Sequence, residues 1–546
     1  MRRTLWLIAL VCTTLIACGG PRPAQDRQPV TSAPVGQDGT LAQGTDGQPW
    51  WNDTVFYELF VRSYYDSDGD GIGDLPGLIA RLDYLNDGDP ATTSDLGVTG
   101  LWLMPIMASP SYHGYDITDY YTVNPEYGTN DDLRRLLNEA HKRGIRVIID
   151  LVLNHTSSQH PWFVEAQDPQ SPKRDWYVWS EDKPAGQGWH AGDNGGYYYG
   201  YFGGGMPDLN YANPAVTTAM HDVIRFWLSD MGVDGFRLDA VKYLYEDVTR
   251  IEHLPATHEW LKAFNLFYKG VSPQAFTVGE VWSDTDTAAS YVGDELDTVF
   301  EFSLADAMIK SAQGGAAADA LRAQQYAQQA YHAGQYATFL ANHDQNRTRS
   351  RLLADEQAKT AASLQLTLPG VPFIYYGEEI GMEGTKPDEN IRRPLQWTAS
   401  GGFSTGTPWN DYYSDLATRN VAAQDADPDS ILQHYRALIR LRSQHAALRV
   451  GQWQAIGAGN PAVYAALRWT EDERILVLIN LSNNAVTEYA LNLETGPLQR
   501  GLQPALLLGE AEPLYAPRIT SAGGLRDYRP TESLPPRSTL ILQLLP

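Results

Sequence analysis

Short β-rich runs alternate with helix-length amphipathic segments along most of this chain, and this alternation restricts the folds open to it. Eight strand-like runs follow one another: Val55–Phe60, Gly100–Met104, Val147–Leu153, Gly235–Leu238, Phe276–Val281, Thr298–Phe302, Ala337–Leu340 and Phe373–Tyr376. Strands separated by helices predict a parallel sheet with crossover helices. Eight such units favour an α/β fold closed as a (β/α)8 TIM barrel, and a doubly wound open sheet is the alternative.

The alternation is interrupted twice, and both interruptions predict additional domains. A polar, Gly-rich and aromatic stretch separates the third run from the fourth, which indicates a small insertion. After the helical run Ile431–Leu448 the apolar period becomes two, the period of strands, in Val463–Trp469, Ile475–Leu481 and Leu540–Leu544. The expected domains are a barrel over 50–153 and 214–448, an inserted domain B over 154–213, and a C-terminal antiparallel β-sandwich, domain C, over 449–546.

The N-terminus has the pattern of a targeting segment. Two arginines follow Met1, and the apolar run Leu5–Ile16 is too short to serve as an ordinary membrane span. Its end, Leu-Ile-Ala-Cys18-Gly, resembles the cleavage site of a bacterial lipoprotein. We therefore expect a signal peptide over 1–17, lipidation of Cys18, and an exported protein anchored to a bacterial membrane. The alternative is a plain secretory signal with an incidental cysteine.

Composition indicates which further structure and which partners to expect of this chain. Residues 18–49 are rich in Gly, Pro, Gln and Ser/Thr, and because they have too little apolar surface to fold, we expect a flexible tether. The formal net charge of −25 argues against a nucleic-acid partner, which requires a basic face. Cys12 and Cys18 are the two cysteines of the sequence, so the mature chain is expected to hold no disulfide. We expect it to act as a monomer.

The segment Gly235–Tyr243, GFRLDAVKY, carries the first sign of chemistry. It places Arg237 two residues before Asp239, at the end of a short apolar run. The preceding run Pro214–Met231 has the 3.6-residue apolar period of a helix, so the pair falls where a strand opens into a loop. A guanidinium neighbour keeps a carboxylate ionised and oriented, as a nucleophile requires. A buried structural ion pair is the alternative explanation.

Other strand-like runs end in polar residues as well. Asn154 and His155 follow the third run, Glu280 lies at the end of the fifth, and His343 and Asp344 follow the seventh. The carboxyl ends of the strands of such a barrel meet at one face, where active sites form. Three carboxylates, two histidines and an arginine are therefore expected at one mouth.

Five segments together resemble conserved regions of the α-amylase family, glycoside hydrolase family 13. They are DLVLNHTS (150–157), MPDLNY (206–211), GFRLDAVKY (235–243), EVW (280–282) and ANHDQNR (341–347), in the family's order. HGYDITDYY (113–121) and YYGEEIGM (375–382) also match. The MPDLN form is similar to that of the intermediate group between oligo-1,6-glucosidases and neopullulanases, which includes lipoprotein α-amylases. The resemblance extends from about Trp50 to the C-terminus.

The resemblance implies a role for each matching residue. Asp239 would be the catalytic nucleophile, and Arg237 would hold it ionised. Glu280 would be the general acid/base, and Asp344 a third catalytic carboxylate that binds sugar hydroxyls. We expect the pKa of Glu280 to lie above that of Asp239, in a less solvated position without a cation of its own. The implied substrate-binding residues are His113, Tyr115, Asp116, His155, Arg237, Lys242, His343 and Arg392. Tyr115 would stack on the sugar ring, and Lys242 would contact the leaving-group side.

Acidic oxygens recur at every second position in the segment DSDGDGIGD (66–74). Glycines let such a loop curl, and carboxylate and carbonyl oxygens suit a hard cation such as calcium. The expected ligands are Asp66, Asp68, Asp70, the Ile72 carbonyl and Asp74. The loop lacks the final glutamate of an EF-hand, but it matches the calcium loop of oligo-1,6-glucosidase-like members of the family. A solvated acidic turn is the alternative.

The resemblance also implies a second calcium site. Asn154 and Asp208 match calcium ligands of typical α-amylases, in which the residue after the motif lysine binds through its backbone carbonyl. That residue is usually histidine and here is Tyr243. A backbone ligand tolerates the change of side chain, and the site remains open at this stage.

The expected function is therefore retaining hydrolysis of α-1,4-glucosidic bonds in starch-type glucans and maltooligosaccharides, as in an α-amylase. An α-glucosidase, a neopullulanase-like enzyme or a glucanotransferase of the same family would use the same residues. A non-catalytic surface glycan-binding protein is the alternative of another class, and the presence of all three carboxylates argues against it.

Overall fold

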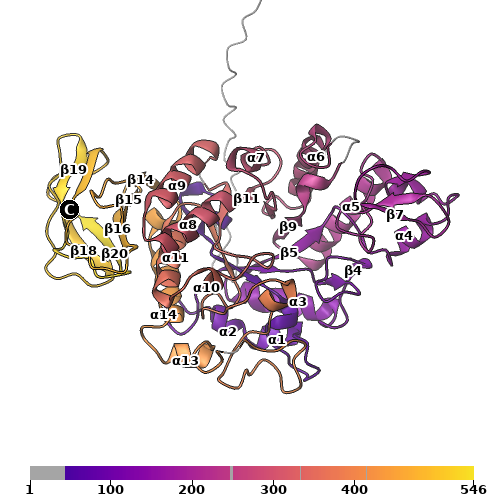
Figure 1. Cartoon of the computed structure of the whole chain (residues 1–546), viewed down its shortest axis with the longest axis horizontal. Coiled ribbons are helices and arrows are strands. Elements are labelled where there is room, and N and C mark those ends of the chain that lie inside the picture. The colour runs from indigo at the N-terminus through magenta and orange to yellow at the C-terminus, as the bar shows by residue number, and fades with distance from the viewer. Residues whose placement is uncertain (1–43, 246–249, 333, 414) are drawn as a thin grey trace, which may run out of the picture. The chain divides into compact units, whose positions relative to one another are not determined.

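The computed structural model describes residues 44–245, 250–332, 334–413 and 415–546, and eight parallel strands form its centre. They close into a barrel in the order β1–β13–β12–β11–β10–β9–β5–β2. Figure 1 labels β5, β9 and β11 of this barrel. The strands are β1 Phe56–Leu59, β2 Gly100–Leu103, β5 Arg146–Val152, β9 Gly235–Asp239, β10 Phe276–Gly279, β11 Thr298–Phe300, β12 Tyr336–Thr338 and β13 Val371–Tyr375. Closure joins the first strand to the last, because Phe56 pairs with both Gly100 and Phe373.

Each barrel strand coincides with one of the eight strand-like runs, so the expected (β/α)8 barrel is confirmed. Every residue of β1, β2 and β9 is buried, as in a parallel sheet whose two faces are both covered. Aromatic rings fill part of the interior: Phe56 stacks on Phe276 at 5.3 Å and on Phe373 at 4.5 Å between ring centroids. The barrel interior is therefore a packed core and not an open channel.

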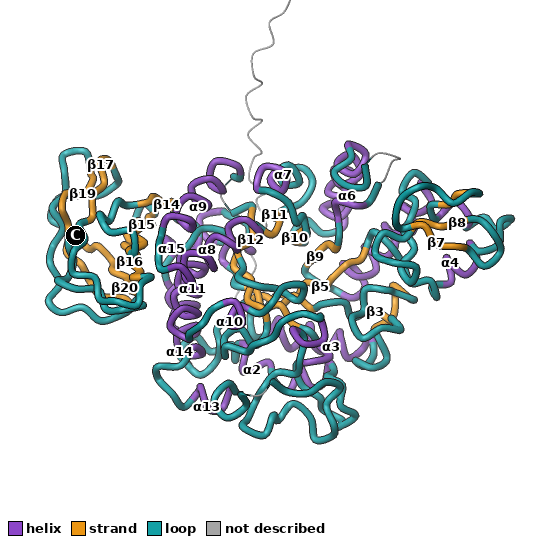
Figure 2. Tube along the Cα trace, viewed as in Figure 1, coloured by secondary structure: helices purple, strands orange, loops and turns teal. Residues whose placement is uncertain are grey.

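Helices and loops connect the strands (Figure 2). The α-helices outside domain B are α1 Leu75–Ala80, α2 Leu82–Leu85, α3 Asn130–Lys142, α5 Pro214–Arg225, α6 Pro255–Val271, α7 Thr285–Ala289, α8 Phe302–Gly314, α9 Ala318–Ala330, α10 Thr348–Arg351, α11 Asp355–Thr367, α12 Asp388–Ile391, α13 Val421–Asp425, α14 Ile431–Gln444 and α15 Ala446–Arg449. Single 3-10 turns lie at η1 Thr45–Gly47, η2 Trp50–Asp53, η3 Val61–Ser63, η4 Arg174–Trp176 and η6 Val241–Tyr243.

The helix before β9 shows how local sequence places the site. Asn213 caps α5 by accepting a hydrogen bond from the Ala215 N–H, and Pro214 takes the first helical position. The helix continues as the π-helical segment η5 Phe226–Met231 and ends at Gly232, whose φ is 84°. The chain then enters β9, and the strand brings its last residue to the end of the barrel.

The expected insertion, residues 154–213, contains helix α4 Pro161–Ala166 and a three-stranded antiparallel sheet in the order β6–β8–β7. Its strands are β6 Trp179–Ser180, β7 Trp189–Ala191 and β8 Tyr197–Tyr199. Phe163 packs against Tyr177 and Tyr198 with 4.9 and 4.8 Å between ring centroids. Aromatic side chains thus form a small core here. The hairpin β3 Met107–Ala108 and β4 Asp119–Val123 precedes the insertion.

The C-terminal residues form two antiparallel sheets with a hydrophobic cluster of their own, which confirms the expected antiparallel C-terminal domain. The larger sheet has the order β14–β15–β16–β20–β18, and the smaller pairs β17 with β19. The strands are β14 Gln452–Ala455, β15 Val463–Trp469, β16 Arg474–Asn480, β17 Leu491–Thr495, β18 Gln503–Leu508, β19 Gly523–Tyr528 and β20 Thr539–Leu545.

Two buried arginines lie where domain C meets the barrel. Arg442 on α14 donates three hydrogen bonds to carbonyl oxygens between Leu366 and Gly370, at 2.7–3.0 Å. Arg468 on β15 donates to the Thr367 carbonyl at 2.5 Å. The carbonyls at the end of a helix have no partner within it, so these arginines satisfy the end of α11.

No helix among the described residues combines the length and the apolar character needed to cross a bilayer. The expected signal peptide, Cys18 and most of the tether fall within residues 1–43, which lie outside the described part of the chain.

Candidate active site

Three carboxylates gather at the carboxyl ends of the barrel strands. Asp239 is the last residue of β9, Glu280 follows β10 directly, and Asp344 lies in the loop after β12. All three line one cavity of about 480 Å³. The other predicted site residues in its wall are His113, Tyr115, His155, Lys242, Tyr243 and Arg392.

The buried guanidinium of Arg237 joins two of these carboxylates, Asp239 and Glu280. Arg237 is 1% exposed. Its Nη1 donates to Asp239 Oδ1 at 2.8 Å and to the two oxygens of Asp150 at 2.9 and 3.0 Å. Its Nη2 donates to Glu280 Oε2 at 2.7 Å. One guanidinium therefore forms ion pairs with three carboxylates. The expectation that Glu280 has no cation of its own is wrong, because β9 and β10 are neighbours and bring Arg237 within reach of both strand ends.

The protonation of the two candidate catalytic groups follows from this geometry. Burial raises the pKa of Glu280, and the charge of Arg237 offsets the rise only in part. Burial also raises the pKa of Asp239, against the opposing effect of Arg237, and the charge of Glu280 adds to the rise. Two carboxylates that share one guanidinium titrate as a pair. The pair therefore retains a proton at a pH where two exposed carboxylates would hold none.

A second set of contacts holds His343 behind the cavity wall. Its Nδ1 lies 2.7 Å from an oxygen of Glu58 on β1, and its Nε2 lies 2.6 Å from the Tyr115 hydroxyl and 3.2 Å from Asp344. The Tyr115 hydroxyl also donates to Asp150 at 3.1 Å. Burial lowers the pKa of His343 well below its ordinary value, so the ring is neutral at pH 7. These bonds fix Tyr115 and Asp344, which do line the cavity.

Two further histidines face the cavity directly. His155 is 1% exposed, and its Nε2 has no hydrogen-bond partner among the described residues. Burial lowers its pKa to about 4, so it is neutral at pH 7. A buried nitrogen without a partner costs free energy, and a sugar hydroxyl would supply the missing bond. His113 Nδ1 accepts from the Tyr115 N–H at 3.1 Å, and burial lowers its pKa as well.

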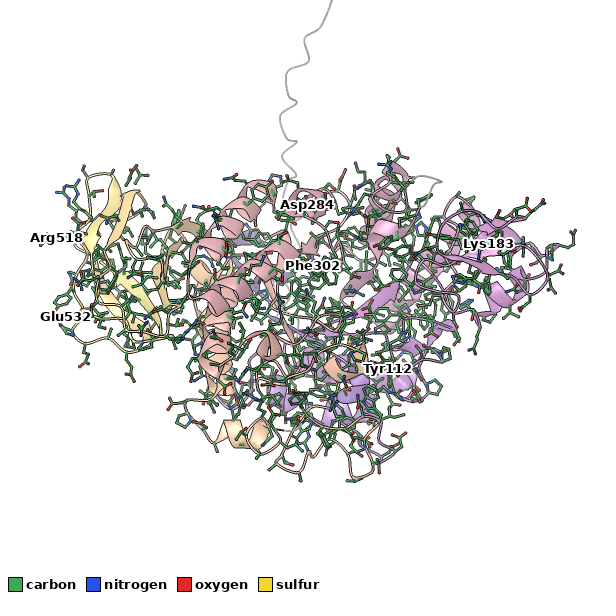
Figure 3. The ribbon with its side chains drawn as sticks, viewed as in Figure 1. Tyr112, Lys183, Asp284, Phe302, Arg518 and Glu532 are labelled. Atoms are coloured by element: carbon green, nitrogen blue, oxygen red, sulfur yellow. The ribbon has the colours of Figure 1, made fainter. Side chains whose placement is uncertain are left out.

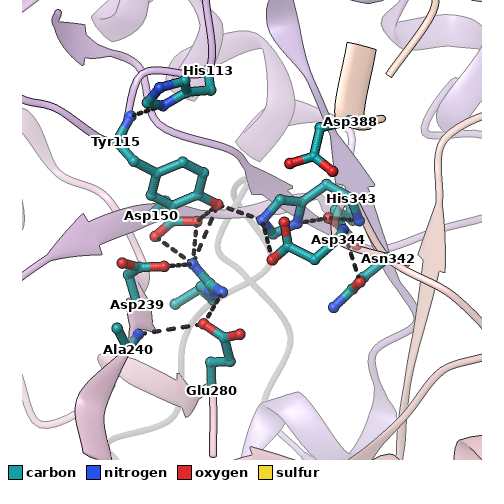
Figure 4. A network of polar contacts seen from close by, with 12 residues as sticks. His113, Tyr115, Asp150, Asp239, Ala240, Glu280, Asn342, His343, Asp344 and Asp388 are labelled. Atoms are coloured by element: carbon teal, nitrogen blue, oxygen red, sulfur yellow. Dashed lines mark hydrogen bonds and ion pairs between the residues drawn. The ribbon is translucent and has the colours of Figure 1, made fainter. Parts of the chain in front are cut away.

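Asp344 belongs to a cluster of charged side chains on one side of the cavity. Arg392 Nη2 donates to Asp344 at 2.9 Å and to Asp388 at 3.3 Å, and its Nε donates to a backbone carbonyl at 3.0 Å. The ammonium of Lys386 lies 3.0 Å from Asp388. Figure 4 shows Asp388 near Asp344. All four side chains line the cavity, so this side presents fixed charges to a ligand.

The segments that follow β9 and β10 also contact each other beside Asp239 and Glu280. Ala240 adopts φ 49° and directs its N–H to Glu280 Oε2 at 3.3 Å. Lys242 Nζ donates to the Trp282 carbonyl at 3.0 Å and lies 2.8 Å from Glu252. The loops that follow β9 and β10 are thus tied together beside Glu280.

Three of the predicted catalytic and substrate-binding residues do not line the cavity. Arg237 and His343 lie behind its wall and act through the groups in front of them. Asp116 is not among the residues that line the cavity, and its charge acts on the cavity histidines His113 and His155. That Asp116 binds substrate stays a prediction. Its carboxylate accepts hydrogen bonds from the hydroxyls of Ser109 and Ser111 and so stabilises a turn.

The structure also adds residues that the sequence did not assign. Glu58 and Asp150 hold His343 and Arg237 from behind, and Asp388 lines the cavity. Glu58 and Asp150 each interrupt an apolar strand, and a carboxylate within a buried strand is a signal that could have found them. Asp388 carried no such signal, because the path of its loop is set by tertiary structure.

The acidic loop after β1 brings three of its carboxylates together. Oxygens of Asp66, Asp68 and Asp74 all lie within 4.8 Å of one another. An all-oxygen, triply charged set of this kind fits a hard cation such as calcium. Asp70, which was also predicted as a ligand, is not in the cluster, and its carboxylate accepts a hydrogen bond from the Ile72 N–H at 2.7 Å.

One observation bears on the second predicted metal site. The amide oxygen of Asn154 is buried and has no hydrogen-bond partner among the described residues, as expected of an oxygen that could coordinate a cation. The Asn154 carbonyl accepts from the Leu209 N–H at 2.9 Å, which places it beside the segment of Asp208. The Tyr243 ring stacks on Tyr201 at 4.4 Å between centroids.

Comparison with known proteins agrees with this architecture. The family model described as "Alpha amylase, catalytic domain" matches residues 58–451. The chain is 41% identical over 445 residues to alpha-amylase 3 of Dictyoglomus thermophilum, covering 80% of this chain and 86% of that protein. It is 34% identical over 529 residues to an oligo-1,6-glucosidase of Heyndrickxia coagulans, covering 80% and 93%. A crystal structure of an alpha-amylase from H. orenii matches with a TM-score of 0.79 at 41% identity, covering 90% of this chain and 99% of that one.

A closed (β/α)8 barrel with three carboxylates around one cavity at its strand ends is an architecture suited to the cleavage of glycosidic bonds. The chain belongs to the α-amylase family, glycoside hydrolase family 13. Its relatives bear the names of amylases and oligo-1,6-glucosidases alike, so the family gives the class of hydrolase and leaves the substrate to be argued from the site.

Proposed function

We propose that this protein is an α-amylase that hydrolyses α-1,4-glucosidic bonds in starch-type glucans and maltooligosaccharides with retention of configuration. The observation that carries the proposal is the junction of Asp239 and Glu280 through Arg237 at one cavity. Burial of both carboxyl groups raises their pKa values against the opposing charge of Arg237, which favours the one shared proton that double displacement requires. The 41% identity to two proteins named alpha-amylase supports the choice of the α-1,4 bond.

In the first step Asp239 attacks the anomeric carbon while Glu280 gives its proton to the departing oxygen. The bond to the Asp239 carboxylate forms as the glycosidic carbon–oxygen bond breaks. Arg237, 2.8 Å from Asp239, favours the ionised form of the nucleophile. Burial raises the pKa of Glu280, which favours the protonated form that the leaving oxygen requires.

In the second step water attacks the same carbon and gives its proton to Glu280, and the ester bond to Asp239 breaks. Two inversions at one carbon restore the original configuration. Asp344, held by Arg392 at 2.9 Å, is placed to accept hydrogen bonds from sugar hydroxyls. His155 and His113 are neutral and add hydrogen bonds without adding charge to the site.

A specific observation favours an α-glucosidase as the second candidate. Lys386, Asp388 and Arg392 place a cluster of charges beside Asp344, and such groups suit the free hydroxyls of a sugar at a chain end. Neopullulanase-like and glucanotransferase activities use the same carboxylates. A non-catalytic glycan-binding protein has no need of a shared proton, so the Asp239–Glu280 junction argues against it.

We further propose that Ca²⁺ binds the loop after β1 through Asp66, Asp68 and Asp74, with Asp70 and the Ile72 carbonyl as further ligands after local rearrangement. Calcium there would neutralise repelling carboxylates and so stabilise the loop. A second site would use Asn154, Asp208 and the Tyr243 carbonyl, and the buried amide oxygen of Asn154 supports it.

We also propose that the protein is exported and held to a bacterial membrane by a lipid on Cys18. The support is the N-terminal sequence, which resembles that of lipoproteins, including those of the intermediate group with the MPDLN motif. Replacement of Cys18 by serine should move the protein from the membrane fraction to the soluble fraction of the expressing cells. Membrane retention of the serine variant would contradict the anchor.

Assay of the full-length protein on a panel of α-glucans tests the activity. Reducing-sugar release from soluble starch, with α-anomeric products at early times by NMR, is the expected result. Products from pullulan, isomaltose and cyclodextrin would separate the related activities, and glucose as the sole early product from long chains would indicate the glucosidase. A protein inert on every α-glucan would refute the proposal.

A further inference from the structure

His253, which does not line the cavity, contacts both loops that carry the candidate catalytic groups. Its backbone N–H donates to the carbonyl of Lys242 at 3.0 Å, and its ring Nε2 lies 3.1 Å from the hydroxyl oxygen of Ser283. Lys242 follows Asp239 by three residues, and Ser283 follows Glu280 by three residues. His253 therefore connects equivalent positions of the loops after β9 and β10.

The ring of His253 also contacts the chain on both sides of the short helix α7, which follows β10. Ser283 lies directly before Asp284, which Figure 3 labels and whose side chain caps the N-terminus of α7. Tyr291 lies two residues after the end of α7, and its hydroxyl oxygen is 2.8 Å from His253 Nδ1. The two ring nitrogens thus hold the chain before and after this helix, and with it the loop after β10.

The partners of the His253 ring are themselves held in place. Tyr291 is fully buried, and its ring packs against His258 with 4.3 Å between centroids. His258 Nδ1 in turn lies 3.0 Å from the buried carboxylate of Glu295. A neutral imidazole donates through one nitrogen and accepts through the other, and a hydroxyl group does either, so both ring contacts form hydrogen bonds in either tautomer.

The backbone of His253 adopts an unfavourable conformation to make these contacts. Its φ is 57°, in the left-handed region that residues with a side chain rarely adopt. The preceding residue, Glu252, lies 2.8 Å from the Lys242 ammonium, so this segment holds Lys242 through its main chain and its side chain. Backbone strain of this kind persists where the surrounding contacts determine the conformation, and it is concentrated at functional sites.

The separation of the two loops decides where the carboxyl group of Glu280 lies. Ala240, the first residue of the loop after β9, directs its N–H to Glu280 Oε2 at 3.3 Å, and Lys242 Nζ donates to the Trp282 carbonyl at 3.0 Å. Both hydrogen bonds depend on a fixed distance between the loops. A proton donor must lie within hydrogen-bond reach of the oxygen that it protonates, so a small displacement of one loop against the other impairs the transfer.

We propose that His253 is a positioning residue for the proton donor: it joins the loops after β9 and β10 and so fixes where Glu280 meets the leaving oxygen. This inference rests on the proposed function, because it gives His253 a part in the same reaction. Loss of the ring should impair the cleavage of a bond whose leaving oxygen takes the proton of Glu280. It should leave nearly intact the cleavage of a bond whose leaving group needs no proton.

Two substrates separate this role from a role in stability alone. Cleavage of maltotetraose needs a proton on the leaving oxygen, whereas fluoride leaves α-glucosyl fluoride without one. The measurement is kcat/KM of the full-length protein for each substrate, and the ratio of the two values does not depend on the fraction of folded enzyme. His253→Gly removes the ring and tolerates the left-handed backbone, and it should lower the ratio of maltotetraose to fluoride about tenfold.

The length of the replacing side chain distinguishes the two ring nitrogens. The terminal amide of glutamine reaches the position of Nε2, so His253→Gln should keep the bond to Ser283 and a ratio within about threefold of wild type. Asparagine reaches only the position of Nδ1, so His253→Asn should resemble His253→Gly. Ser283→Ala removes the same bond from the other loop and should lower the ratio as well. The double variant His253→Gly/Ser283→Ala should lose little more than His253→Gly alone.

Ser290→Ala is the matched control. Ser290 is exposed at the end of α7, and its hydroxyl donates to the Thr287 carbonyl at 2.7 Å, so its loss should leave the ratio unchanged. An unchanged ratio in both His253→Gly and Ser283→Ala would overturn the inference alone, whether activity falls equally on both substrates or on neither. A wild type that cleaves neither substrate would refute the proposed function as well.

Discussion

Arg237 Nη2 lies 2.7 Å from Glu280 Oε2, while Nη1 of the same guanidinium lies 2.8 Å from Asp239 Oδ1. The proposed reaction moves a negative charge from Asp239, which becomes an ester, to Glu280, which becomes a carboxylate. The cation is in contact with the charged partner before and after this step. Neither group has to move to keep its counter-ion, so the reorganisation that the site undergoes during the step is small.

The first prediction concerns the nucleophile. Asp239→Asn should lower kcat on maltooligosaccharides by about 10³-fold or more, because an amide neither attacks the anomeric carbon nor carries the charge that stabilises the transition state. Asp230→Asn, an exposed position of η5, is the matched control and should keep wild-type activity. Starch hydrolysis at wild-type rate by Asp239→Asn would rule out its assignment.

The second prediction concerns the pH dependence of the general acid. Burial raises the pKa of Glu280 above its ordinary value, so the protonated form persists into less acidic solution. As pH rises through that pKa the acid is lost, and kcat/KM for maltotetraose should fall. For α-glucosyl fluoride the first step needs no proton donor, so the same basic limb should be weak or absent.

The variant Glu280→Gln checks the same assignment independently of pH. Its kcat/KM for maltotetraose should fall about 10³-fold, and its kcat/KM for α-glucosyl fluoride less than about tenfold. Equal losses on both substrates would show that Glu280 is not the proton donor.

The third prediction concerns a buried carboxyl group outside the cavity. Burial raises the pKa of Glu378 to about 7, although Thr348 and Tyr435 donate hydrogen bonds to it. The unfolded chain releases this proton near pH 4.3, so between about pH 4.3 and 7 the folded state holds one proton more. The free energy of unfolding should fall by about 3 kcal/mol as pH rises through this window, and no further above it.

Denaturant unfolding at several pH values measures this effect. Glu378→Gln cannot ionise and should remove most of the decline between pH 5 and 7. The exposed Glu488→Gln should preserve it. An identical pH dependence in wild type and Glu378→Gln would refute the raised pKa.

The fourth prediction concerns the acidic loop after β1. Exhaustive chelation should lower the Tm by several degrees, and added Ca²⁺ should restore it, because a bound cation stabilises the folded state by mass action. Asp74→Asn should abolish the response to Ca²⁺, since it removes one of three clustered carboxylates. Asp89→Asn, in an exposed acidic turn outside the cluster, is the control. A wild-type Tm that does not change on chelation would exclude the calcium site.

The barrel was predictable because each of its strands carries its own local signal. An apolar run bounded by helix caps and turns is visible without tertiary information, as in the approach to β9 through Asn213 and Gly232. In domain C only the three most apolar strands were predicted. The strands β14, β17, β18 and β19 were missed because they are short or alternate weakly, and their pairing partners lie far along the chain.

Most residues of the candidate site could be predicted from the sequence, but the contacts between them could not. The position of Asp239 at a strand end follows from sequence. The sharing of Arg237 with Glu280 does not, because it depends on the register of β9 against β10. The orientation of the Asp116 carboxylate likewise depends on the hydroxyls of Ser109 and Ser111, which no local pattern identifies.

The pairing of Phe56 with Phe373 has a consequence for how activity is acquired during folding. These residues are separated by more than half of the chain, so their contact carries a large loop-closure entropy and is expected to form late. Glu58, on the same strand as Phe56, then reaches His343 behind Asp344. A chain cut before β13 would keep all three carboxylates, Glu58 and His343, but it would lack the strand that joins β1 to β12 and closes the barrel. Hydrolytic activity should therefore recover during refolding only when β1 pairs with β13. This recovery should come later than any signal from helix formation.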